Sequence, residues 1–540
     1  MSLNNKFKLP LLANVIEYLH LAAEGKVRYS NVLKKYKNIS LQIYNYIPLK
    51  HLILFLGLFY IFGVFITGIT LDPYLVYDDS NTLNISSHST KEILEILSYE
   101  QNFPSYYLLA HLLITQFHTV KAVVIFNLVV WVCSIIFFYR LIKTYISADN
   151  WSYVYTLLFV LTSSISYYAY HTRMYGLIIL LVILYFYSVQ QYIAMPRKRW
   201  IGAQGVVFLG LSLLHPAAIL TLPIIVIVSL LLATKRNHFI SLAIFGLLSA
   251  TVLSLHFIQK SNLYESYLSR GIEYIAEANH TGYSFFVQTL FFPDLFAESA
   301  SNVVFYIFIL LILFKSIFVH RLKLTQSNLI PVILSFIYIF FSIFFAPYLQ
   351  PRHLLFFVIP VLLTIFIGLQ SFTLSSRVLF SLVLFIFFLG FSLQQFSTIY
   401  TLNHQAEIFC SSIRRIRNSI ILTDFSTFNF VERCDNGENE IVVLGESAVN
   451  SASVSAKDLR IYQARSGGLT SLSMWEAGSS QTIVKVLKQY LDENTSNKNI
   501  FFARAIEYKP KIFADELLLF NKYIFSSFEG TSILVFEKKE

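Results

Sequence analysis

The chain is poor in charged residues. Only 13% of its 540 residues are Asp, Glu, Lys or Arg, whereas 56% are hydrophobic and 16% are aromatic. The mean hydropathy of +0.60 is too high for a soluble protein of this length. Apolar stretches of about 18 to 24 residues recur, and each is long enough to cross a hydrocarbon core roughly 30 Å thick. We therefore expect a polytopic membrane protein.

We expect no cleavable signal peptide, and we find no internal repeat in the sequence. The stretch Leu11–Ala23 is only modestly apolar and is followed by basic residues. A secretory signal instead has a short basic region, an apolar core and a small-residue cleavage site. We predict that residues 1–48 form a cytoplasmic basic arm against the inner headgroups; an arm without membrane contact is the alternative. The missing repeat weakens the hypothesis of an inverted-repeat transporter.

Cysteine is scarce, with three residues in the chain. Cys133 lies within a predicted membrane span, where it fills space as a small apolar side chain. Cys410 and Cys434 lie in a segment that we expect to face outward, where oxidation is permitted. These two are disulfide candidates, and the sequence alone does not decide whether they are bonded.

The apolar stretches predict about eleven transmembrane helices in an all-α membrane domain, residues 49–400. Basic residues concentrate in short cytoplasmic loops, so they determine the sidedness of the spans. Under strict alternation the basic clusters fall on one face, which places the N-terminus in the cytoplasm and the C-terminus outside. These clusters are Arg140 with Lys143, Arg197–Arg199, Lys235 with Arg236, Arg321 with Lys323, and Arg377. The predicted spans are 51–70, 122–143, 151–169, 175–194, 200–214, 217–234, 239–258, 302–320, 328–346, 354–371 and 378–398.

The formal net charge of +10 resembles that of a nucleic-acid-binding protein. Much of it lies in the N-terminal arm and the inward loops, where it acts as a topology signal and contacts anionic headgroups. We therefore expect membrane lipids as partners and no nucleic acid.

Two longer outward loops remain, 71–121 and 259–301. The first contains the acidic pair Asp78-Asp79 in a solvated loop, followed by an amphipathic helix at Thr90–Tyr99. It ends with an apolar helix at Pro104–His118, which is too short to span. We interpret that helix as re-entrant or interfacial, since a full span there would reverse the sidedness of everything that follows.

The composition becomes that of a soluble protein near residue 400, which predicts a small extracytoplasmic α/β domain at 401–540. Short apolar runs predict its strands, and the segment Thr482–Leu491 predicts a helix. The predicted strands are Ile420–Leu422, Ile441–Leu444, Ile500–Phe502 and Ser532–Phe536.

The polar residues at outward breaks suggest a catalytic site. An outward site has no supply of nucleotide sugars, so a transferase there needs a donor carried in the membrane, such as a polyprenyl-phosphate sugar. Asp78 is the candidate base or metal ligand and Asp79 its assistant. Arg173 and Arg352 are candidates to bind the phosphate through forked hydrogen bonds. The other candidates for donor-phosphate binding are His171, His215 and Tyr175. The acidic pair could also hold a divalent cation.

Short motifs in this region resemble those of polytopic glycosyltransferases of the GT-C class, in the bacterial branch related to protein O-mannosyltransferases and the lipid A aminoarabinose transferase. The resemblance covers roughly residues 50–400. It implies transfer of a sugar from a polyprenyl-phosphate donor to an extracytoplasmic glycan, lipid or protein, at the periplasmic side of a bacterial inner membrane. The matching stretches are Tyr77–Ser80, Phe103–Leu109, His171–Tyr175, Leu214–Pro216 and Pro351–Leu355.

This chain departs from the family pattern at four motif positions, of which Asp79 in place of Glu is a tolerable change. Phe103 stands where the family has histidine, Ser105 where it has proline, and His171 where it has an acid. The substituted His171 could take over the work of the acid, or the substrate could differ. A membrane transporter or lipid flippase and a catalytically degenerate scaffold of cell-envelope assembly are the alternative functions.

Overall fold

The computed structural model divides the chain into two compact units, Met1–Phe59 and Tyr60–Glu540. The arm 1–48, most of the loop 259–301 and the segment Thr482–Leu491 lie outside the described residues. The same holds for the predicted span 302–320 apart from a few residues. The described residues are 49–73, 77–98, 102–146, 149–261, 307, 309, 310, 312, 326–344, 355–435, 437–444, 500–503, 523–527 and 534–538.

Among the described residues, five helices are long and apolar enough to cross a membrane. Their apolar sides, and those of the shorter apolar helices, remain open: Leu247 and Leu231 are 70% and 79% exposed. Such exposure is favourable in lipid and unfavourable in water. The chain is therefore an integral membrane protein. The five helices are α3 (Leu49–Thr70), α7 (Lys121–Tyr145), α10 (Tyr175–Ala194), α13 (Arg236–Gln259) and α19 (Leu374–Ile413).

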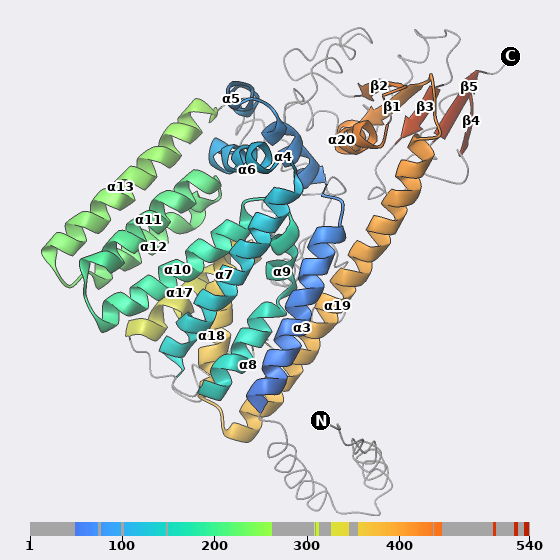
Figure 1. Ribbon diagram of the computed structural model, residues 1–540. Helices are drawn as coiled ribbons and strands as arrows, with labels where there is room; N and C mark the ends of the chain where they lie inside the picture. Colours follow the sequence, from blue (N-terminus) through green and yellow to red (C-terminus); the bar gives the residue numbers. More distant parts are fainter. Residues whose placement is uncertain are drawn as a thin grey trace, which may run out of the picture. The chain divides into compact units, whose positions relative to one another are not determined.

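Shorter apolar helices pack against α10, α13 and α19 (Figure 1). Helices that are close in the sequence are also neighbours in space: α7 contacts α10, α10 contacts α11, and α11 contacts both α12 and α13. A described helix overlaps every predicted span except 302–320, and the full number of crossings stays a prediction. The shorter helices are α11 (Lys198–Leu214), α12 (Ala218–Leu232), α17 (Gln326–Phe344) and α18 (Val358–Gln370).

The predicted single helix at 151–169 is wrong. The structure has two helices there, α8 (Asp149–Val160) and α9 (Ser163–Tyr170). Thr162 between them is extended, with φ −67° and ψ 107°, and its hydroxyl donates to the carbonyl of Leu158 at 3.0 Å. Hydroxyl side chains compete with the helical hydrogen bonds of the backbone. A run of such residues from Thr162 to Ser166 explains the break.

The segment 71–121, which we predicted to face outward, contains more helix than expected. The expected helices are present as α5 (Thr90–Ser98) and α6 (Pro104–Phe117). The acidic pair, however, lies in a third helix, α4 (Tyr77–Ser87), and not in a loop. Acidic residues in the first turn of a helix interact favourably with its dipole, which is consistent with this placement.

Helices α4, α5 and α6 pack on one another through a small apolar cluster. Ile85, Ile93, Leu97 and Tyr107 are its buried members. At about 1.5 Å per residue, the 14-residue α6 is about 21 Å long, which is shorter than a hydrocarbon core. It begins at Pro104 and ends at His118 in the left-handed region (φ 51°). The interpretation as a non-spanning helix agrees with this length.

The C-terminal segment contains a five-stranded sheet with the order β2-β1-β3-β5-β4 (Figure 1). Strands β2, β1 and β3 are parallel, and β5 runs antiparallel to both β3 and β4. Helix α20 (Phe425–Cys434) connects β1 to β2 and, like β4, was not predicted. The strands are β1 (Ile420–Asp424), β2 (Glu440–Leu444), β3 (Ile500–Ala503), β4 (Tyr523–Ser527) and β5 (Leu534–Lys538).

Candidate functional site

A buried carboxylate on α4 is the centre of the candidate site. Asp79 is only 2% exposed, and its Oδ2 contacts Nδ1 of His171, which is equally buried. Its Oδ1 accepts a hydrogen bond from the backbone N–H of Thr172 at 2.9 Å. The hydroxyl of Thr172 donates to the backbone carbonyl of Asp79 at 3.3 Å. These contacts join α4 to the turn between α9 and α10, 92 residues away in the sequence.

The same turn carries Arg173, which is 8% exposed. Its Nη1 donates to the hydroxyl of Thr82 on α4 at 3.0 Å and to that of Tyr107 on α6 at 3.3 Å. The carboxylate, the imidazole and the guanidinium predicted from the sequence therefore lie together. Their burial corrects the expectation that Asp79 is a hydrated loop residue.

Asn127, in the first third of α7, holds the turn from the other side. Its side-chain amide donates to the backbone carbonyls of His171 and, at 3.4 Å, Arg173. It also donates to the Tyr106 hydroxyl at 2.9 Å. Burial raises the pKa of the Tyr106 phenol, and the hydrogen bond from Asn127 opposes that shift. The phenol is therefore a neutral hydroxyl next to the site.

Aromatic rings surround His171. The ring centroids of Tyr167 and Tyr170 lie 3.6 and 5.1 Å from that of the imidazole. Nδ1 of the imidazole contacts Asp79, whereas the buried Nε2 has no hydrogen-bond partner among the described residues. A histidine held by a carboxylate at one nitrogen, with the other directed elsewhere, is suited to proton transfer.

Two other candidates, His215 and Tyr175, form a separate contact. Their ring centroids are 5.5 Å apart, and Tyr175 also packs against Tyr168 at 4.7 Å. Nδ1 of His215 accepts the backbone N–H of Ala217 at 3.0 Å, just before α12 begins. This local bond is consistent with a structural role for His215 at the helix start.

Two candidates cannot be placed. The backbone of Asp78 belongs to α4, but its side chain lies outside the described residues, as does the whole of Arg352. Within the described part of the chain, no group of three or more His, Cys, Asp or Glu residues could hold a metal ion. The divalent cation at the acidic pair stays a prediction.

Sequence reasoning missed four polar residues that complete the cluster. Asn127 was the one with a usable signal, because it is a polar residue inside the apolar run of α7, where such residues are rare and often functional. Tyr106 and Tyr107 belong to the motif stretch Phe103–Leu109 but were not predicted as site residues. Thr82 carries no comparable signal, because its contact depends on how α4 packs.

The fold and this cluster define a class: an integral membrane protein whose helix ends enclose a carboxylate–imidazole–guanidinium cluster. No protein-family model and no curated protein matches the chain. Among solved structures, ArnT from Cupriavidus metallidurans in the apo state is similar, with a TM-score of 0.49 and 12% identity. The structure of the same protein bound to undecaprenyl phosphate has a TM-score of 0.47 and 12% identity. Each match covers 89% of this chain and 97% of that chain. At these values the likeness assigns no activity or substrate to this chain.

Proposed function

We propose that the chain is a membrane glycosyltransferase that transfers a sugar from a polyprenyl-phosphate donor to an extracytoplasmic acceptor. The observation that carries this proposal is the buried contact of Asp79 with His171, next to Arg173 in the same turn. It combines a group that can move a proton with a group that can bind a phosphate, in a protein whose membrane helices offer an apolar surface to a lipid.

His171 is the proposed general base, and Asp79 orients it. The acceptor hydroxyl oxygen attacks the anomeric carbon, and the bond from that carbon to the phosphate oxygen breaks. Nε2 of His171 takes the hydroxyl proton, and polyprenyl phosphate leaves with the electron pair of the broken bond. Asp79 keeps its charge and stabilises the imidazolium that forms, as carboxylates do in other acid–base pairs. His171 is proposed here in place of Asp78, which the sequence suggested as the base or a metal ligand.

Arg173 is the proposed contact of the leaving phosphate. A guanidinium offers five donors in a planar fork that matches a phosphate. Arg352 remains the proposed second phosphate contact, and His215 and Tyr175 remain proposed donor-site residues at its edge. Asp78, predicted from the sequence as the base or a metal ligand, is proposed to assist the pair, because it belongs to the same helix as Asp79.

The site is proposed to face the periplasm, with residues 1–48 in the cytoplasm and residues 401–540 outside as a separate α/β domain. The placement follows from the basic clusters of the inward loops, since basic residues favour the cytoplasmic side. A bacterial inner membrane, where polyprenyl-phosphate donors are available, is the proposed location.

The test is to identify lipids bound to the purified protein and to follow their turnover. Mass spectrometry of protein in nanodiscs should detect a polyprenyl phosphate or its sugar conjugate. Added polyprenyl-phosphate sugar should be converted to free polyprenyl phosphate by the wild type and by Arg140→Lys, a control at the opposite helix end, but not by His171→Ala. A wild type that neither retains nor converts such lipids would refute the proposal and favour a transporter or scaffold.

A further inference from the structure

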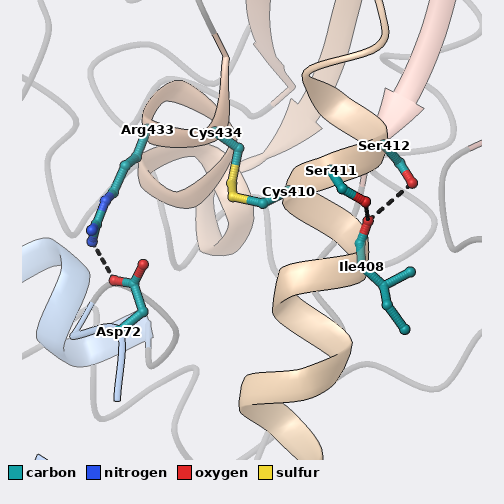
Figure 2. Close-up of a disulfide and its surroundings, with 7 residues drawn as sticks. All are labelled: Asp72, Ile408, Cys410, Ser411, Ser412, Arg433 and Cys434. Atoms are coloured by element: carbon teal, nitrogen blue, oxygen red, sulfur yellow. Dashed lines mark hydrogen bonds and ion pairs between the residues drawn. A yellow bond between two sulfur atoms is a disulfide. The ribbon is translucent and has the colours of Figure 1, made fainter. Parts of the chain in front are cut away.

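The connection between α3 and α4 leads directly to the site, and two cations from distant parts of the sequence hold it. Nζ of Lys121, at the start of α7, donates to the backbone carbonyl of Ile69 at 2.8 Å and to that of Leu71. The guanidinium of Arg433 pairs with the carboxylate of Asp72 (Figure 2). Asp72 precedes Asp79 by seven residues, so these contacts hold the chain at the point where it leaves α3.

The residue next to Arg433 in the sequence is covalently cross-linked to another helix. Its neighbour Cys434, the last residue of α20, forms a disulfide with Cys410 of α19 (Figure 2). The Cα atoms of the two cysteines are 4.9 Å apart, and Cys434 is fully buried. The rings of Phe409 and Phe430 stack beside the bond with their centroids 5.5 Å apart. The structure thus contains the disulfide that the sequence left open.

Helix α20 also packs directly on α4. An ion pair whose side chains are 42% and 28% exposed, as those of Arg433 and Asp72 are, contributes little by itself. A cross-link next to one partner reduces the freedom of that partner and raises its effective concentration at the other. The disulfide and the ion pair therefore together hold α20 against α4, the helix that carries Asp79.

We propose that α20, held by the Cys410–Cys434 disulfide and the Arg433–Asp72 pair, positions α4 so that Asp79 meets His171. None of these four residues belongs to the reacting cluster, so they are positioning residues. The tests of this inference that measure kcat rest on the proposed function. The C-terminal segment that contains α20 thereby contributes to activity. Full turnover requires the disulfide between Cys410 and Cys434.

The first test uses Cys410→Ser with Cys434→Ser, and Cys133→Ser as the matched control for losing a cysteine. Hydrogen exchange of the α4 amides, residues 77–87, should be faster in the double variant and unchanged in the control. This readout needs no activity, so it judges the positioning role even if the proposed function fails. Unchanged exchange of α4 in the double variant overturns the inference.

The second test separates positioning from general stability. A misplacement of about 1 Å can lower a rate ~100-fold, so partial misplacement should lower kcat roughly 3- to 10-fold at temperatures well below unfolding. The KM for the donor should change less than kcat, because Arg173 lies on the α9–α10 turn and is bonded to Tyr107 of α6 as well as to Thr82 of α4. A fall in kcat that is matched by a rise in KM, or no change in kcat, contradicts the inference.

Arg433→Ala keeps the disulfide and provides the same test if the serine variant does not purify. Arg433→Asp and Asp72→Arg should each lower kcat, and the two changes combined should restore most of it, because the ion pair is re-formed with opposite polarity. Failure of the combined variant to exceed either single variant overturns the role of the pair. A wild type without transferase activity refutes the proposed function alone.

Discussion

Charged residues at the two ends of the membrane helices have opposite environments. At the site end, Asp79, His171 and Arg173 are buried and bind groups far away in the sequence. At the other end, Arg140 and Arg199 are exposed and lie over the rings of nearby aromatic residues, 5.7 and 4.6 Å from the centroids of Phe137 and Trp200. The exposed residues behave as interfacial anchors, whereas the buried ones require a functional explanation.

Arg377 shows how an arginine at the second end can be well bonded and still structural. Its guanidinium donates to the carbonyls of Leu369, Gln370 and Phe372 at 3.1, 2.6 and 3.1 Å. Leu369 and Gln370 end α18 and Phe372 follows it, and basic side chains often satisfy the last acceptors of a helix. All its hydrogen-bond acceptors lie within eight residues of the sequence. Long-range hydrogen bonds combined with burial therefore distinguish a site from an anchor here.

We expect the largest effect from replacing the buried pair, Asp79 and His171. Asp79→Asn and His171→Gln should each lower turnover by ~10²–10⁴-fold, because a positioned acid–base group contributes about that much to a rate. The matched control is Glu95→Gln, which removes an exposed acid from the neighbouring helix α5 and should have no effect. Turnover should be measured as release of polyprenyl phosphate in nanodiscs. Near wild-type rates in both site variants would show that the pair is only structural.

Exchanging arginine for lysine compares the two ends directly. Arg173→Lys preserves the charge but removes the planar fork, and hydrogen bonds to charged groups are worth roughly 1.5–3 kcal/mol. We expect donor affinity and kcat/KM to fall by about ten-fold or more. Arg140→Lys at the other end should leave both unchanged. Equal behaviour of the two variants would mean that Arg173 is also an anchor.

Asn127 allows the support of the turn to be tested separately from its chemistry. Asn127→Ala leaves the carbonyl of His171 and the hydroxyl of Tyr106 without this donor. Leaving buried polar groups unsatisfied should lower the free energy of unfolding by about 1–3 kcal/mol. Thermal unfolding of Asn127→Ala should be compared with that of Asn237→Ala, an exposed asparagine near the start of α13. An equal change in both would show that the hydrogen bonds of Asn127 do not stabilise the fold.

Hydropathy and charge alternation predicted most of the membrane helices, because long apolar runs and the basic residues that bound them are local signals. They also brought Asp79, His171 and Arg173 to the same end of the bundle. The break at Thr162 was missed because its cause is the competition of hydroxyl groups with the backbone, which hydropathy does not register.

Burial at the site could not be predicted either. In the sequence, Asp79 is a polar residue within a polar segment, which does not predict burial. It is buried because α4 packs on α6 and contacts the α9–α10 turn. The same packing gives Thr82 and Tyr107 their contacts with Arg173. These partners are separated by many residues, and no local pattern relates them.

The smallest expected effect is on stability and concerns Glu92, which is exposed whereas Asp79 is buried. Glu92 accepts from the backbone N–H and the hydroxyl of Ser89 at 3.0 and 2.7 Å, which caps α5. These bonds lower the pKa of Glu92 below its usual value. Its stabilising contribution is therefore present above that usual value and lost as the pH falls through the lowered pKa.

Glu92→Gln should accordingly unfold at a slightly lower temperature than the wild type at neutral pH, and the difference should shrink in acid. Glu95→Gln, on the same helix, should show neither effect. Thermal unfolding at several pH values checks this. A difference that grows in acid would contradict the capping role of Glu92.

The most direct test of the account is the sidedness of the site, because the lipid-linked donor was inferred from an outward-facing site. Single cysteines should be introduced at Ser98 and Ser375 in a Cys133→Ser background; both serines are exposed and lie at opposite helix ends. A membrane-impermeant thiol reagent should label Ser98→Cys only from the outside and Ser375→Cys only from the cytoplasm. The reverse pattern would place the Asp79–His171–Arg173 cluster on the side where nucleotide sugars are available, and it would contradict the assignment of a polyprenyl-phosphate donor.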